Sequence, residues 1–194
     1  VSRAFRDAGW HMTTCDRDPD VSADLSDWEE LDPDDWTDLD FIWWSPDCSV
    51  YSTMSFPKGH FNNGIAMTDE AKAAERSNLK VICFIMKVKP RWLIIENPRA
   101  LMRTRPWIEP LFERRTITQC QYGSDRMKPT DLFGRFPTKW EAKACKNGAP
   151  CHIAAPRGSK TGTQGRDRKE VAKIPYMLAI SLAHAMNQEA RLWG

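Results

Sequence analysis

The chain contains no apolar run that approaches the roughly 18 residues of a membrane-spanning helix. It shows no signal peptide, because Val1 opens directly into a mixed polar and apolar segment, and no internal repeat, which argues against a solenoid. These absences predict that the protein has no membrane partner and a cytoplasmic location. With 194 residues, 41% of them hydrophobic, the chain is expected to form one globular domain and to be a monomer.

The six cysteines do not suggest a disulfide framework, because without a secretion signal a reducing cytosol is expected. Cys15, Cys83 and Cys120 stand in or beside apolar segments, where buried free thiols are common. We therefore expect these three thiols to be buried and unpaired.

Acidic and basic residues are separated along the chain. Residues 1–50 hold 14 Asp and Glu against 3 Lys and Arg, whereas residues 111–175 hold 14 Lys and Arg against 6 Asp and Glu. This asymmetry indicates one face that binds polyanions and one that is kept away from them. The basic residues gather where regular periodicity is lost, at 134–173, which favours phosphate binding over simple solubilisation.

The predicted elements follow the order of a doubly wound α/β fold. Apolar runs predict strands at 11–15, 21–25, 41–44, 92–95 and 116–122. Helices are predicted before Gly9, from Thr68 to Pro90, at 106–114 and at 174–187, with one surface turn of helix in 27–40 and a flexible loop at 53–67. The helix after Thr68 has a clear apolar side, made of Ala71, Ala74, Asn78, Val81, Ile82, Ile85 and Met86.

Two side chains at predicted strand ends favour covalent catalysis. Cys48 follows an apolar strand and a proline-bearing turn, so its thiol is expected at the strand tip, where a lowered pKa would make it a nucleophile. A small buried hydrophobic residue is the alternative interpretation. Glu96 follows two isoleucines, where a carboxylate is costly unless it has a partner or a function. A raised pKa would let it act as an acid.

Two aspartates also stand near strand ends. Asp16 is placed to bind the hydroxyls of a nucleotide ribose, and Asp24 could accept a hydrogen bond from an exocyclic amine. Ordinary turn or N-cap aspartates are the alternative interpretation in so acidic a region.

Six short motifs follow one another along the chain. Residues 46–52, Pro-Asp-Cys-Ser-Val-Tyr-Ser, are similar to a Pro-Pro-Cys-Gln-x-x-Ser motif, and Glu96-Asn97-Pro98 to Glu-Asn-Val. Tyr122-Gly123 with Arg126-Met127-Lys128 resembles Tyr-Gly followed by Arg-x-Arg. The remaining three are the opening helix, the pair Asp16 and Asp24-Leu25, and Ile174-Pro175 with its helix. Their order and spacing resemble those of the DNA cytosine-5 methyltransferases, which use S-adenosylmethionine.

This resemblance implies a Rossmann-like S-adenosylmethionine-dependent methyltransferase fold with a small loop-rich recognition insertion. Residues 1–133 would form the catalytic core without its first strand and glycine loop, 134–173 the basic DNA-recognition insertion, and 174–194 a C-terminal helix that packs back on the core. The implied partner is double-stranded DNA. The target cytosine is rotated out of the duplex and reacts through a covalent bond between Cys48 and its C6.

The resemblance also implies the roles of single residues. The implied catalytic residues are Cys48, Glu96, Arg126 and Lys128. The implied cofactor-binding residues are Asp16, Arg17, Asp24, Leu25 and Pro46. The implied DNA-binding residues are Ser52, Arg99, Lys139, Arg157 and Lys160.

The chain departs from the family in four ways. The Phe-x-Gly-x-Gly cofactor loop would lie before Val1, so either the natural chain continues upstream or cofactor binding is impaired. Asp47 replaces the second proline and places a charge beside Cys48, and Lys128 replaces an arginine. The insertion is also short, which suits a small phage-like or prokaryotic-like member. Two alternatives stay open: a non-catalytic DNA-binding relative, and a relative that acts on RNA or transfers another group.

A second site is predicted in the basic segment. Cys145, Cys151 and His152 offer soft ligands for a zinc ion, and Cys120 is a further ligand if the fold brings it near. Unligated thiols are the alternative, because the spacing is not that of a standard zinc finger. The basic side chains of this segment are interpreted as a phosphate-binding surface: Lys139, Lys143, Lys146, Arg157, Lys160, Arg166 and Arg168.

Overall fold

The computed structural model describes residues 1–16, 18, 21–154 and 167–192, and its fold is mixed α/β, as predicted. Contacts divide the chain into two compact units. The first unit consists of Val1–Thr13, Arg115–Thr130 and Pro137–Gly194, and the second of Thr14–Arg114 and Asp131–Phe136. A Rossmann-like methyltransferase fold and the functional division at residues 133 and 173 stay predictions. Among the described residues, no helix combines the length and apolar character needed to span a membrane.

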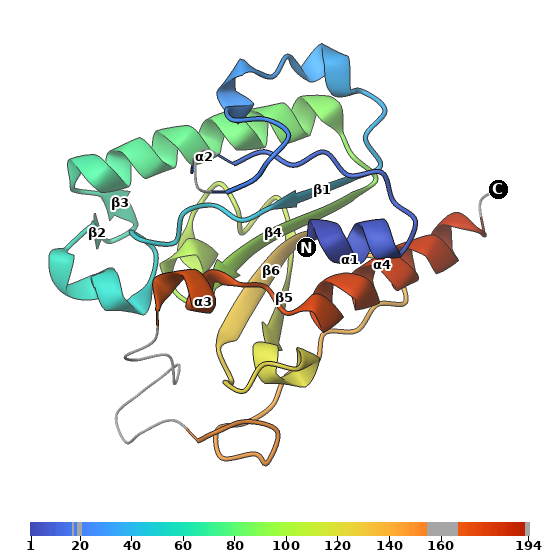
Figure 1. Ribbon diagram of the computed structural model, residues 1–194. Coiled ribbons are helices and arrows are strands. Elements are labelled where there is room, and N and C mark those ends of the chain that lie inside the picture. The colour runs from blue at the N-terminus through green and yellow to red at the C-terminus, as the bar shows by residue number, and fades with distance from the viewer. Residues whose placement is uncertain (17, 19–20, 155–166, 193–194) are drawn as a thin grey trace. The chain divides into compact units, whose positions relative to one another are not determined.

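The main sheet is mixed. Its strands lie in the order β1 (Phe41–Trp44), β4 (Trp92–Pro98), β6 (Pro129–Arg135) and β5 (Glu113–Thr118). β1 and β4 are parallel neighbours, with Phe41 paired to Trp92 and Trp44 to Ile95 (Figure 1). Residues 92–97 of β4 are all buried, as a continuous apolar run predicts for a strand covered on both faces. The two strands predicted with the clearest apolar runs are therefore adjacent, and their carboxyl ends lie at one edge.

Helix α2 (Asp69–Val88) begins where the sequence predicts. The Oγ1 of Thr68 accepts a hydrogen bond from the backbone N–H of Ala71 at 3.3 Å, which caps the helix. The buried side of the helix consists of Ala71, Asn78, Val81, Ile82, Ile85 and Val88. Met86 is 49% exposed, contrary to its predicted place on this side, because one residue past Ile85 the helix has turned by about 100°.

A buried polar network in the second unit joins α2 to the segment after β1. The hydroxyl of Tyr51 donates to Oε1 of Glu75 at 2.8 Å and accepts from Nδ2 of Asn78 at 2.8 Å. The indole Nε1 of Trp107 donates to Oε2 of the same glutamate at 2.9 Å. Burial, and then the neighbouring Glu75 carboxylate, raise the pKa of Tyr51 well above its ordinary value. Tyr51 is fully buried, so the network fixes the chain three residues after Cys48.

The segment 53–67 has regular structure where the sequence predicts a loop. It contains the 3₁₀ helix η3 (Thr53–Lys58) and a hairpin of β2 (Phe61–Asn62) and β3 (Ile65–Ala66). The hairpin turn consists of Asn63 and Gly64, which have φ values of 45° and 82°. An Asn-Gly pair favours these left-handed conformations. This pair is therefore the feature of the sequence that indicates a hairpin here.

The predicted strands at 11–15 and 21–25 are wrong. The two segments form only one parallel bridge, between Cys15 and Leu25. The acidic stretch 27–40 holds two short 3₁₀ turns, η1 (Trp28–Glu30) and η2 (Pro33–Trp36). Asp27 and Asp32 cap these turns with their side chains, which is the local role that aspartate favours over strand formation.

The helix predicted at 106–114 and the strand predicted at 116–122 are also misplaced. Residues 106–111 form irregular turns, because Pro110 has no N–H to donate in the middle of a helix. β5 instead begins at Glu113 and ends at Thr118, where the 3₁₀ helix η5 (Gln119–Tyr122) follows.

Strand β6 was not predicted, because Pro129, Asp131 and Gly134 all read against a central strand. The Asp131 carboxylate is 1% exposed and accepts two hydrogen bonds from Arg103, from Nε at 2.9 Å and from Nη2 at 2.6 Å. The paired charge makes its burial tolerable. Tertiary contacts thus override the local preference.

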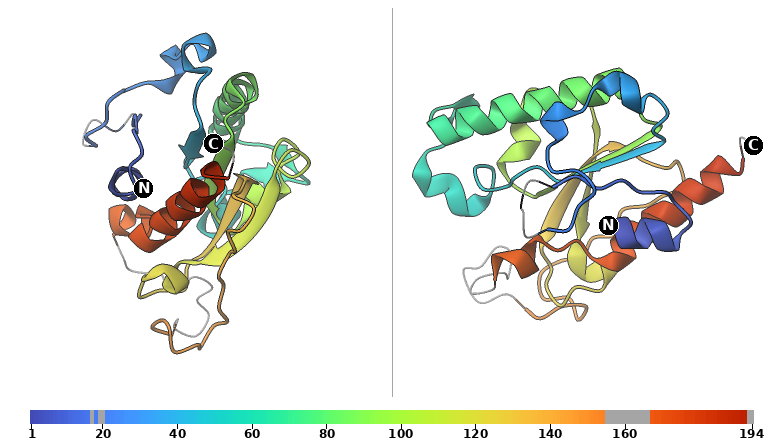
Figure 2. Two further views of the ribbon diagram at one scale, coloured as in Figure 1. Left: turned by 90° about the vertical axis from the view of Figure 1, so that its right-hand side faces the viewer. Right: turned by 45° about the horizontal axis from the view of Figure 1, so that its top comes forward.

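In the first unit, the N-terminal and C-terminal helices of the chain pack against each other. Helix α1 (Ser2–Asp7) lies alongside α4 (Tyr176–Ala190), as both views of Figure 2 show, and each helix was predicted. The Nε1 of Trp10 donates to Oδ1 of Asn187 at 2.8 Å, and Nδ2 of Asn187 donates to the carbonyl of Ala8 at 2.9 Å. The unit also contains the short helix α3 (Arg168–Ala172), which the sequence did not predict.

Gly134→Ala is expected to lower the free energy of unfolding strongly, because β6 approaches β4 too closely for a side chain. Gly134 has φ of 149°, and a Cβ there would lie 1.9 Å from the carbonyl oxygen of Leu93. A backbone shift is needed to relieve this overlap, so denaturant titration should show a loss of about 3 kcal/mol or more. Gly59→Ala is the matched control, since Gly59 has φ of 63° but open space around it, and about 1 kcal/mol is expected. Equal losses in both variants would contradict the close approach.

Candidate active site and metal cluster

Cys48 lies in a tight turn that follows β1. Its carbonyl oxygen accepts hydrogen bonds from the backbone N–H of Tyr51 at 3.1 Å and of Ser52 at 2.9 Å. Pro46 is buried, Asp47 is exposed and Cys48 is half-buried. The thiol thus stands in a turn at the strand end and differs from the fully buried core residue of the alternative interpretation.

The carboxylate of Asp47 is engaged by Ser49. The backbone N–H of Ser49 donates to Oδ1 at 2.8 Å, and the Ser49 hydroxyl donates to Oδ2 at 2.7 Å. Asp47 therefore shapes the turn as well as placing an anion next to Cys48. A proline here would remove the charge, but it would also remove both hydrogen bonds.

Glu96 and Asn97 end the neighbouring strand in the same unit. Glu96 is 6% exposed and Asn97 is fully buried. The Nδ2 of Asn97 donates to the carbonyl oxygen of Pro46 at 3.2 Å, which ties the end of β4 to the turn that carries Cys48. The structure thus brings a thiol and a buried carboxyl group to the same edge of the sheet, as the parallel pairing requires.

Asp16 and Asp24 lie on the two segments that the Cys15–Leu25 bridge joins. Oδ1 of Asp16 accepts from the N–H of Asp18 at 2.9 Å. Oδ2 of Asp24 accepts from the N–H and the hydroxyl of Thr14 at 2.7 and 2.8 Å. These are the contacts of turn-forming aspartates. Both carboxylates are exposed, and each has about four acceptor positions, so a ribose or an amine would still fit them.

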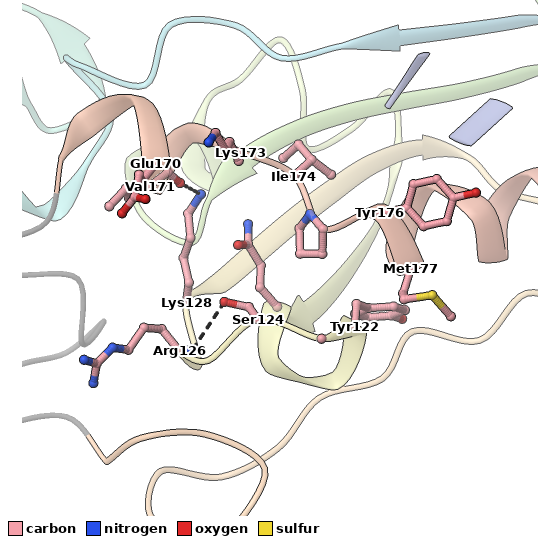
Figure 3. A pocket seen from close by; sticks show the side chains of 13 residues that line it. Tyr122, Ser124, Arg126, Lys128, Glu170, Val171, Lys173, Ile174, Tyr176 and Met177 are labelled. Carbon is pink, nitrogen blue, oxygen red and sulfur yellow. Dashed lines mark hydrogen bonds between the residues drawn. The ribbon is translucent and has the colours of Figure 1, made fainter. Parts of the chain in front are cut away.

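Arg126 and Lys128 belong to the first unit, where they line a cavity of about 330 Å³ (Figure 3). Its other lining residues are Gln119, Tyr122, Gly123, Ser124, Glu170, Val171, Lys173, Ile174, Pro175, Tyr176 and Met177. The Nζ of Lys128 reaches across to donate to the carbonyl oxygen of Val171 at 2.5 Å, and Lys128 is only 7% exposed. The Arg126 guanidinium extends to the side in Figure 3, with Nε 3.9 Å from Oδ2 of Asp125. The cavity therefore joins the two motifs predicted at 126–128 and 174–175.

The remaining predicted binding residues are dispersed. Ser52 is half-buried at the start of η3, and Arg99 is exposed directly after β4. Lys139, Lys143 and Lys146 are exposed in the first unit. Arg17, Arg157, Lys160 and Arg166 lie outside the described residues.

A Cys₃His cluster in the first unit could hold a metal ion. It consists of Cys120, Cys145, Cys151 and His152, whose donor atoms all lie within 4.8 Å of one another. The fold thus brings Cys120, whose place the sequence leaves open, next to the other three ligands. Cys120 is buried as predicted, whereas Cys15 and Cys83 are exposed, because their segments turn them outward.

Two thiols of the cluster have shifted pKa values in opposite directions. Burial raises the pKa of Cys120 to about 12. Burial has the same effect on Cys145, but hydrogen bonds from Thr118 and from the two neighbouring thiols outweigh it and lower the pKa of Cys145. The Nε2 atom of His152 is buried and has no hydrogen-bond partner in the part of the chain that the structure describes. Its Nδ1 faces the sulfurs.

Two residues that organise the site were not recognised from the sequence. The sequence pattern assigns Asn97 only to a motif, although its amide links the end of β4 to the turn after β1. Glu75 holds Tyr51 in place and had no predicted role. One signal was present: Asn78 is a polar residue on the buried side of α2, and such a residue needs a buried polar partner.

Comparison with known proteins gives no further guide: no protein-family model matches the chain, and no curated protein matches it. The geometry of the two units therefore carries the functional argument.

Asp47→Asn is expected to increase the reactivity of Cys48 without changing the turn. The amide keeps an acceptor for Ser49 but removes the negative charge, and the loss of a nearby anion favours the thiolate. We expect alkylation of Cys48 by iodoacetamide at neutral pH to become about threefold faster, measured by mass spectrometry of the Cys48 peptide. Asp38→Asn, which removes an exposed carboxylate before β1, is the control. Equal rates in the wild type and Asp47→Asn would show that the charge has no effect on Cys48.

Proposed function

We propose that this chain transfers a methyl group to C5 of cytosine in double-stranded DNA, with S-adenosylmethionine as the cofactor. One observation carries the proposal. Cys48 lies in the turn after β1, the buried Glu96 lies near the carboxyl end of the adjacent parallel strand β4, and the Asn97–Pro46 hydrogen bond holds the two segments together. A nucleophile beside a carboxyl acid is the arrangement that addition to the C5–C6 double bond of cytosine requires.

The proposed reaction begins with addition of the Cys48 thiolate to C6, which forms an S–C6 bond and moves an electron pair toward C5 and N3. Glu96, in its protonated form, donates a hydrogen bond to the N3 edge and stabilises the developing negative charge. When bound, S-adenosylmethionine would supply the methyl group by cleavage of its S–CH₃ bond, with S-adenosylhomocysteine as the leaving group. After C5 has been methylated, its proton is lost to solvent, the S–C6 bond breaks and the Cys48 thiolate is restored.

The cofactor would be held by Asp16 and Asp24, whose exposed carboxylates lie on adjacent segments of the second unit. Pro46 and Leu25 would contribute apolar contact. Carboxylates suit the hydroxyls of ribose and the exocyclic amine of adenine. None of these steps uses the Cys₃His cluster.

The segment 53–67 supports DNA as the substrate. Four large apolar side chains on it are at least half exposed, namely Met54 at 78%, Phe56 at 50%, Ile65 at 66% and Met67 at 51%. Four such side chains on one short segment suit a contact surface, and proteins that kink DNA insert apolar side chains between base steps. The segment follows Cys48 directly, so it would cover the extracted cytosine. The exposed lysines of the first unit add a contact to phosphate that weakens with salt.

Cys48→Ala is expected to abolish methyl transfer to DNA, measured as tritium incorporation from labelled S-adenosylmethionine. Glu96→Gln should retain DNA binding and lose about two to four orders of magnitude in rate, since an amide N–H stabilises the developing negative charge at N3 much less than a carboxylic acid does. Cys83→Ala, which removes an exposed thiol on α2, should leave the rate unchanged. Methylation by Cys48→Ala at the wild-type rate would overturn the proposal.

S-adenosylhomocysteine is expected to raise the melting temperature of the wild type. A ligand that binds only the folded state stabilises it by about 2.7 kcal/mol at a concentration of 100 times Kd. Asp16→Ala should reduce the shift, while Asp38→Ala should not. DNA binding without any shift would favour the non-catalytic relative, and methylation of RNA alone would favour the third alternative.

A further inference from the structure

We propose that Cys120, Cys145, Cys151 and His152 bind one Zn²⁺ in a closed structural site that holds residues 143–153 against η5. Three thiols and one imidazole are a complete set of ligands for tetrahedral zinc. The proposal does not depend on methyl transfer, because the four ligands all belong to the first unit and Cys48 belongs to the second.

Four distances between the donor atoms can be compared with the edges of a tetrahedral zinc site. The Sγ of Cys120 lies 3.2 Å from that of Cys145 and 3.7 Å from that of Cys151. The Nδ1 of His152 lies 3.6 Å from the Sγ of Cys145 and 3.4 Å from that of Cys151. Around zinc, with bonds of about 2.3 Å to sulfur and 2.0 Å to nitrogen, the edges are about 3.8 Å between sulfurs and about 3.5 Å between sulfur and nitrogen. Three of the four separations agree closely, and a small outward shift of the Cys145 thiol satisfies the fourth.

Hydrogen bonds from three backbone N–H groups hold the ligand-bearing segments together. The N–H of Cys145 donates to Oγ1 of Thr118 at 2.9 Å, and the N–H of Thr118 donates to the carbonyl of Lys143 at 3.1 Å. On the other side of the loop, the N–H of Ile153 donates to the carbonyl of Asp125 at 2.9 Å. The segment that carries three ligands is therefore docked at both ends on the segment that carries the fourth.

Burial of apolar surface cannot account for the order of this segment. No residue from 141 to 154 is buried, so the hydrophobic effect contributes little here. A structural metal supplies folding free energy in such loops. A disulfide explains less, because it would use only two of the four donors, and a bonded pair of sulfurs lies about 2.05 Å apart.

The four protein ligands leave no open position on the ion, so its role is structural rather than catalytic. Zinc binding would nevertheless also affect the cavity that Arg126 and Lys128 line. Cys120 is part of η5, and two other residues of η5, Gln119 and Tyr122, line the cavity together with Arg126. Zinc is thus expected to fix one wall of this cavity.

The full chain, purified without chelators, is expected to contain one zinc per molecule by inductively coupled plasma mass spectrometry. Cys151→Ser and His152→Ala should each lose most of the metal while keeping the far-ultraviolet circular dichroism of the wild type, because neither residue is buried. Cys83→Ser, with an exposed thiol in the other unit, should keep its zinc. Retention of zinc by both ligand variants would overturn the proposal, because the metal would then be bound elsewhere.

Cobalt gives a second readout of the same site. Co²⁺ added to metal-free protein should give thiolate-to-cobalt absorption and the intense visible bands of tetrahedral coordination, and Cys151→Ser should weaken both. In hydrogen exchange, metal removal should accelerate exchange at 143–153 and 119–122 and leave α2 unchanged. A wild type that contains no zinc and gives no cobalt spectrum would refute the site, and uniform exchange changes would refute its local role.

Discussion

The parallel pairing of β1 with β4 is the constraint on which the candidate active site depends. Parallel strands share a direction, so two segments more than forty residues apart in sequence deliver their next residues to one edge. The pairing alone would leave the turn after β1 loosely placed. The Asn97 amide removes this freedom by binding the Pro46 carbonyl, and Tyr51 fixes the far side of the turn. Cys48 thus sits in a turn that is anchored on both sides.

These anchors are buried polar groups, and their energetics make them specific. An unsatisfied buried donor or acceptor costs about 1–3 kcal/mol, so the Tyr51, Glu75 and Asn78 network tolerates only one arrangement of its members. The Arg103–Asp131 pair acts in the same way on β6. Breaking such a pair leaves a charge buried without compensation. These polar networks therefore fix the positions of segments that apolar packing alone would hold in several alternative positions.

The sequence predicted the elements whose local preference agrees with their tertiary surroundings. β1, β4, α2 and α4 have continuous apolar runs or a clear apolar side, and their bounds were found within a few residues. The failure to predict β6 has a tertiary cause. β6 contains Asp131 and Gly134, which a local pattern does not favour in a strand: Arg103 pairs with the buried Asp131, and the close approach of the Leu93 backbone leaves no room for a side chain at Gly134. Cys120 entered the cluster in the same way, through a fold that spacing does not encode.

The proposed zinc ion would order the loop in the basic segment without the help of a hydrophobic core. Fixing the backbone of the eight residues from Cys145 to His152 costs roughly 8–16 kcal/mol in conformational entropy, and structural zinc in small peptides binds with about 10–16 kcal/mol. One ion is therefore enough to order a loop that buries no side chain. A loop ordered in advance loses less entropy when it meets a polyanion. Its exposed Lys143 and Lys146 would then bind phosphate from fixed positions, which turns a diffuse attraction into a defined surface.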